Sequence, residues 1–196
     1  MVIEPVTLEG TVIRLEPLSL RHHEELCAVG LDERIWRWNP RAPLCTPADM
    51  RAYIDTALEQ QADGEGLPFA TIDKAAGHAV GSTRFLEINC RDRRVEIGST
   101  WIAPAWQRTA VNTEAKYLML RHAFETLGCI RVELKTDSLN ERSRNAILRI
   151  GATQEGIFRN HMLTHSGRIR HSVYFSITDA EWPAVKARLQ EKLAPR

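Results

Sequence analysis

A chain of 196 residues is long enough to bury the core of one larger-than-average domain. Its composition, 43% hydrophobic and 26% charged, is ordinary for a globular protein and argues against disorder. The formal net charge of +1 shows neither a nucleic-acid signature nor a polybasic membrane signature, so we expect neither partner.

The first third of the chain predicts a strand followed by two helices. Val12 to Leu15 are expected to form the opening strand, and Ser19 is placed to cap the first helix. The second helix is better marked, because Thr46 is a good N-cap and Pro47 suits the first helical position. We expect this helix to end near Gly64.

From Leu67 to Ile102 the hydrophobic pattern changes to period two, which is typical of strands. Three strands are expected, at about 68–72, 79–88 and 94–102. The breaks between them are short and polar, which predicts an antiparallel meander.

A helix from about Thr113 to Leu127 and a strand over 129–135 follow the meander. The helix has an apolar stripe formed by Tyr117, Leu120, Phe124 and Leu127. A strand, a helix and a further strand in this order predict a βαβ crossover, so the two strands should be parallel.

The last part predicts a short helix from about Glu141 to Ile150, a hairpin around 165–167 and a final helix. Thr178 and Glu181 have capping-box spacing, so that helix should start at Thr178 or Asp179. The expected fold is therefore a mixed α/β domain over residues 1–196. Its sheet should be mostly antiparallel, with one parallel pair and flanking helices.

The sequence favours a cytoplasmic location. No apolar run approaches the ~18 residues that a membrane span needs, and the start of the chain lacks a signal-peptide pattern. The four cysteines are scattered, which is typical of reduced thiols, and no metal site is expected.

The loop from Gln107 to Asn112 is a candidate anion site. It leads from a strand into a helix whose free N–H groups and dipole favour a phosphate. Asn112 is placed to cap that helix, and Gln107 and Arg108 add side-chain donors. An ordinary βα turn is the alternative, and the spacing alone does not decide between them.

This stretch resembles the cofactor-binding segment of the GNAT acetyltransferase superfamily, whose pattern is Gln or Arg, two residues, Gly, one residue, and Gly or Ala. Those places fall on Gln107, Ala110 and Asn112. Residues 113–115, 140–143, 150–152 and 154–156 are similar to the branch of Rim-type ribosomal-protein N-terminal acetyltransferases. The resemblance covers almost the whole chain.

The resemblance implies direct transfer of an acetyl group from acetyl-CoA to an amine, either a protein N-terminus or a small molecule. It also implies that the family's frequent homodimer is a candidate assembly. The residues expected to bind acetyl-CoA are Ile102, Gln107, Arg108, Thr109, Ala110, Val111, Asn112, Thr113, Asn140 and Ser143.

Glu96 is the candidate general base, since it resembles the glutamate of the branch's strand; a solvated strand glutamate is the alternative. Many members of the superfamily place a tyrosine where this chain has Ile147, which leaves Ser143 as the candidate acid or hydrogen-bond donor to the thiol sulfur. Trp36 and Trp38 are candidates for the acceptor wall, with core packing as the alternative.

Ala110, the missing tyrosine at Ile147 and the open choice of base motivate an alternative function, and the loop departs from the family pattern at two positions. Ala110 replaces the usual Gly, which costs about 1 kcal/mol if that position needs a positive φ, and Asn112 replaces a Gly or Ala. The alternative is a module that binds coenzyme A with little catalysis and acts as a sensor or an interaction domain.

Overall fold

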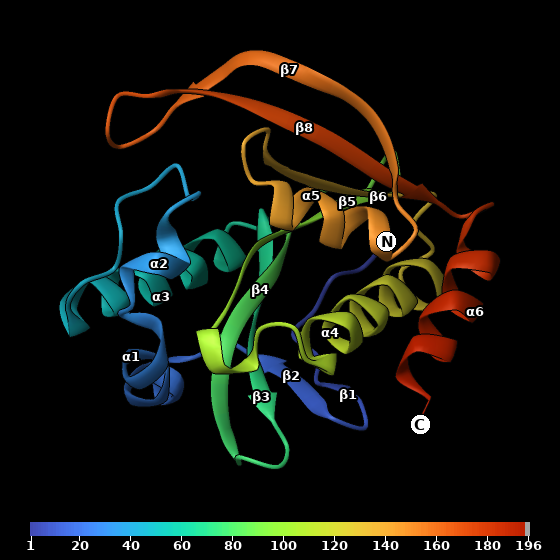
Figure 1. Cartoon of the computed structure of the whole chain (residues 1–196). Helices are drawn as coiled ribbons and strands as arrows, with labels where there is room; N and C mark the ends of the chain where they lie inside the picture. Colours follow the sequence, from blue (N-terminus) through green and yellow to red (C-terminus); the bar gives the residue numbers. More distant parts are fainter. Residues whose placement is uncertain (195–196) are drawn as a thin grey trace.

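One eight-stranded sheet organises residues 1–194, which are the residues that this computed structural model describes (Figure 1). The spatial order is β1-β2-β3-β4-β5-β6-β8-β7, and every neighbouring pair is antiparallel except β5–β6. The strands are β1 (Leu8–Glu9), β2 (Ile13–Pro17), β3 (Gly66–Asp73), β4 (His78–Asn89), β5 (Arg94–Ile102), β6 (Arg131–Asp137), β7 (Thr153–Leu163) and β8 (Ile169–Thr178).

Helices connect these strands and cover both faces of the sheet (Figure 1). The α-helices are α1 (His23–Gly30), α2 (Glu33–Trp36), α3 (Pro47–Ala62), α4 (Ala110–Arg121), α5 (Glu141–Arg149) and α6 (Trp182–Leu193). Short 3-10 turns occupy η1 (Leu20–His22) and η2 (Pro104–Trp106), and a π-helical turn, η3 (His122–Thr126), extends α4.

Alternation along the strands produces two hydrophobic cores, one on each face. On β3, Phe69 belongs to the core that contains α4 and α6, while its neighbour Ala70 belongs to the core that contains α1 and α3. On β5, Val95 and Ile97 pack into the first of these cores, so Glu96 between them faces the other side of the sheet.

Most of the expected elements are confirmed. The meander β3–β4–β5 is antiparallel, β5 and β6 are parallel, and β7 and β8 form the hairpin. The Thr46 hydroxyl accepts a hydrogen bond from the Asp49 amide, and Pro47 opens α3 as predicted.

Several elements differ from the prediction. The first helix begins as the turn η1, and α2 forms where no helix was expected. The final helix starts at Trp182, because β8 continues to Thr178 and the Glu181 carboxylate accepts hydrogen bonds from the amide and hydroxyl of Thr178. None of the helices within residues 1–194 combines the length and apolar character that crossing a bilayer requires.

Candidate functional site

The two parallel strands part from one another and leave a gap. Their ladder runs only from the Arg94–Arg131 pair to the Glu96–Glu133 pair, although β5 continues to Ile102 and β6 to Asp137. Main-chain groups along the diverging edges are therefore free to pair with an extended ligand.

A β-bulge lies in β5 beside this gap. Arg84 faces Gly98 and Ser82 faces Trp101, so two residues of β5, Ser99 and Thr100, lie opposite the single residue between Ser82 and Arg84. Ser99 has a φ of 47°, which is rare for a residue other than glycine. The bulge turns the strand at the position where the gap opens.

Two helix N-termini lie at the wide end of the gap, because α4 follows β5 and α5 follows β6. The prediction that Asn112 caps the first of them is wrong. Thr109 is the N-cap, and its hydroxyl accepts a hydrogen bond from the Val111 amide, so α4 begins three residues earlier than expected. A helix N-terminus presents free N–H groups and a positive dipole end to an anion.

The earlier start of α4 removes the expected strain at Ala110. That residue is the first in the helix, where a β-carbon costs nothing, and the left-handed residue of the loop is Arg108, with a φ of 64°. The side chains of Val111 and Thr113 are buried, so those two residues can offer a ligand little beyond their main chain.

Gln107 connects the two sides of the gap. Its Nε2 donates to the carbonyl of Ile102 at 2.9 Å, and its Oε1 accepts from Nη1 of Arg142 at 2.6 Å. The structure thus brings the predicted loop residues, Ile102 and the start of α5 to the same end of the gap.

The first turn of α5 contains two further predicted residues. Asn140 is the helix N-cap, and its Oδ1 accepts from the amide of Ser143 at 3.1 Å. Ser143 is half-buried, whereas Ile147 points into the core with α4, on the face of the sheet away from Glu96. The role expected for Ser143 stays a prediction.

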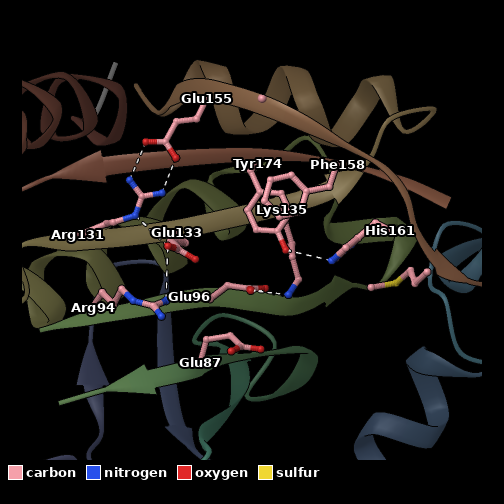
Figure 2. Close-up of a pocket in the computed structure, with 12 residues that line it drawn as sticks. Glu87, Arg94, Glu96, Arg131, Glu133, Lys135, Glu155, Phe158, His161 and Tyr174 are labelled. Atoms are coloured by element: carbon pink, nitrogen blue, oxygen red, sulfur yellow. Dashed lines mark hydrogen bonds and ion pairs between the residues drawn. The ribbon is translucent and has the colours of Figure 1, made fainter. Parts of the chain in front are cut away.

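Glu96 lies in the floor of a cavity of about 590 Å³ on the face of the sheet opposite α4 (Figure 2). Every residue that lines the cavity belongs to strands β4 to β8. Glu96 is only 2% exposed, and the Nζ of Lys135 lies 2.7 Å from its carboxylate. Burial raises the pKa of the Glu96 carboxyl, and the Lys135 ammonium offsets that effect only in part.

A second lysine lies behind Glu96. Lys116 of α4 is 6% exposed, and its Nζ donates to Oγ1 of Thr100 in the bulge at 2.7 Å. Burial lowers the pKa of Lys116 to about 7, and the charge of Glu96 acts in the opposite direction. A buried carboxylate that has a raised pKa and lies close to two lysines has the features of a general base.

The predicted acceptor residues occupy two environments. Trp36 is 2% exposed, donates from Nε1 to the Gly30 carbonyl and packs against Tyr53 and Trp101, as the core-packing alternative expects. Trp38 is half-buried beside the hairpin, and the Arg168 guanidinium lies 5.9 Å from its ring centroid.

Sequence reasoning missed the residues that surround Glu96 in the cavity. Lys135 comes from β6, Tyr174 from β8, and Phe158 and His161 from β7. The rings of Phe158 and Tyr174 stack at 4.2 Å, and the hydroxyl of Tyr174 lies 3.4 Å from Nε2 of His161. The sequence predicted the alternation between faces, the β5–β6 pair and the β7–β8 hairpin, but not that β8 would lie beside β6.

Comparison with known proteins agrees with this architecture. Residues 13–153 match the acetyltransferase (GNAT) domain, which is most of the chain. A sheet with one parallel pair that parts beside two helix N-termini is thus the scaffold of an acetyltransferase. The chain belongs to the GNAT acetyltransferase family.

Relatives with names or structures extend the likeness. The "Putative ribosomal N-acetyltransferase YdaF" of Bacillus subtilis is 28% identical over 180 residues, which are 90% of this chain and 94% of that protein. A GCN5-related N-acetyltransferase from Brucella melitensis is 37% identical, with a TM-score of 0.92, 98% of this chain covered and 87% of the other.

A second similar structure contains a ligand. Mycobacterium smegmatis RimJ, in complex with CoA-disulfide, has a TM-score of 0.80 at 21% identity, with 95% of this chain and 91% of the other covered, a likeness that shows the fold. The expected likeness to Rim-type enzymes is confirmed by the name of the Bacillus subtilis relative.

Proposed function

We propose that this acetyltransferase moves an acetyl group from acetyl-CoA to an amine, with Glu96 as the general base. The observation that carries the proposal is the position of Glu96, a buried carboxylate at the last paired residue before β5 and β6 part, open to a cavity. A protonated amine in that cavity would reach a carboxylate beside the gap.

The residues at the wide end of the gap fit coenzyme A. Its pyrophosphate is an anion, and the donor set there consists of the first-turn amides of α4, the exposed Thr109 and the side chain of Arg108. The pantetheine arm needs main-chain partners, which the unpaired edge of β5 up to Ile102 supplies, with Asn140 and Ser143 on the other side. The CoA-disulfide of the similar RimJ structure supports this choice of ligand.

The chain's own groups then have defined tasks. Glu96 takes the proton of the acceptor ammonium, which frees the nitrogen lone pair. Acetyl-CoA supplies a thioester carbonyl, at which the C–N bond forms as the C–S bond breaks. Ser143 is the candidate to donate a hydrogen bond to the departing sulfur, which takes up a proton.

The acceptor is proposed as a protein N-terminus or a small amine. The Bacillus subtilis relative, named as a ribosomal N-acetyltransferase, favours the first of these. The homodimer and the cytoplasmic location stay predictions.

The test is the release of free thiol from acetyl-CoA in the presence of a mixture of amines and amino-terminal peptides. We expect release that depends on both the protein and an acceptor. Binding of acetyl-CoA without release above background would instead identify a coenzyme-A-binding module, the alternative defined by Ile147 and the altered loop pattern.

A further inference from the structure

The charged side chains of the cavity can be assigned to pairs. Lys135 pairs with Glu96 at 2.7 Å, and Arg131 pairs with both Glu133 and Glu155. Arg94 adds a weaker contact to Glu133 at 3.7 Å. These three cations and three carboxylates balance in charge.

Glu87 is the one cavity carboxylate without an ion-pair partner among residues 1–194. It lies on β4, next to the residue paired with Glu96, in a stretch where the register between β4 and β5 shifts. Figure 2 shows it on the same side of the sheet as Glu96 and Lys135. The cavity therefore has an excess of one negative charge.

The charge of Glu87 acts on the floor of the cavity. It raises the pKa of the Glu96 carboxyl, after the larger effects of burial and of Lys135. If Glu87 were neutral, the Lys135 ammonium would repel an incoming ammonium, and no unpaired carboxylate of the cavity would offset that repulsion.

The opposite wall of the cavity suits a cationic chain. Tyr174 and the half-exposed Phe158 stack on each other, and the Lys135 ammonium lies 5.9 Å from the ring of Tyr174. Aromatic faces attract cations and pack against methylene groups at the same time.

We propose that the acceptor of this enzyme carries a second positive charge, and that Glu87 binds it while the reacting amine lies at Glu96. The acceptor class is thus a diamine, or a peptide whose amino-terminal residue is followed by a basic one. Phe158 and Tyr174 flank the methylene chain between the two charges. This inference rests on the proposed acetyl transfer and adds the specificity of the same site.

The test compares matched acceptors that differ only in the second charge: cadaverine with pentylamine, and seryl-lysine amide with seryl-norleucine amide. The wild type should have a higher kcat/KM for the dicationic member of whichever pair it acetylates. Glu87→Gln should lower that kcat/KM about three- to fivefold, mainly through KM, as expected for a partly screened ion pair. The monocationic member should change less than about twofold.

The matched control is Glu191→Gln, which removes the same charge from an exposed position on α6, away from the cavity. It should leave both members of each pair unchanged. Equal kcat/KM for the two members in the wild type, or equal losses for both in Glu87→Gln, would overturn the inference and leave acetyl transfer standing. Absence of turnover with every acceptor in the wild type would overturn both proposals.

Discussion

Replacement of Glu96 by glutamine removes the charge of the proposed base and preserves its size. The wild-type carboxylate is 2% exposed and lies 2.7 Å from the Nζ of Lys135. An amide oxygen can still accept a hydrogen bond from Lys135, so the cavity should keep its shape. The amide cannot take a proton from the acceptor.

The magnitude of the rate loss follows from this single missing function. A positioned general base contributes about 10²- to 10⁴-fold, so kcat for Glu96→Gln should fall by at least about a hundredfold. In the wild type, kcat/KM should decline as the pH falls through the raised pKa of Glu96, above the ordinary value of 4.5. Glu96→Gln should lose that limb of the profile.

The stability of the fold should also depend on the pH through Glu96. Because the folded-state pKa of Glu96 is raised, its contribution to stability is fully present below the unfolded pKa and is lost as the pH rises through the folded pKa. Ionisation of Glu96 therefore lowers the free energy of unfolding of the wild type as the pH rises between the two pKa values, and Glu96→Gln should lose this pH dependence.

The assay measures thiol release from acetyl-CoA over a range of pH, together with urea unfolding of the same samples. Glu191→Gln is the control for a generic loss of charge. Glu96→Gln with near wild-type kcat would refute the role of Glu96 as base. If the variant is slow but also unfolded, the loss of rate reflects lost structure and not the missing base.

Three further changes test other parts of the structure. In Gly98→Ala, the new β-carbon would lie 2.5 Å from Oε1 of Glu96, so the carboxylate should be displaced. We expect kcat to fall about 10²-fold while the circular dichroism spectrum stays unchanged. An unchanged kcat would contradict this prediction. Glu114→Ala should lower the free energy of unfolding in urea by about 3–5 kcal/mol, because the buried Glu114 carboxylate accepts hydrogen bonds from the backbone amides of residues 11–13. A loss below about 1 kcal/mol would contradict this prediction. Burial lowers the pKa of Lys116 from 10.5 to about 7, so its contribution to stability is present above the unfolded pKa and is lost as the pH falls toward 7. Lys116→Met should therefore stabilise more at pH ~6 than at pH ~10 in guanidinium titrations, and equal effects would argue otherwise.

The fold could be predicted because its signals are local. Period-two patterns with short polar breaks define the meander of β3 to β5, and Thr46 with Pro47 marks the start of α3. The start of α4 was misplaced for a physical reason: Thr109 and Asn112 are both good N-cap residues, and only the backbone geometry determines which side chain meets an amide.

The candidate site could be predicted only in part. Glu96 and the loop at Gln107 lie in a contiguous stretch of sequence that resembles a known family, so the motif located them. The βαβ pattern predicted β6 beside β5, but it predicted neither the register that brings Lys135 to Glu96 nor the order β6-β8-β7 that brings Tyr174 to the cavity. That order is a long-range property, which local propensity does not encode.

The most direct test of the central claim is a thermal-shift titration of the wild-type protein with acetyl-CoA, with ATP and NAD as controls. A ligand present at ~100 times its Kd adds about 2.7 kcal/mol of stability, which raises the unfolding midpoint by an easily measured amount. The gap between β5 and β6, with Thr109 and the α4 N-terminus at its wide end, predicts a shift specific to acetyl-CoA. No shift at millimolar acetyl-CoA, or an equal shift with ATP, would contradict the assignment of this gap as the acetyl-CoA site.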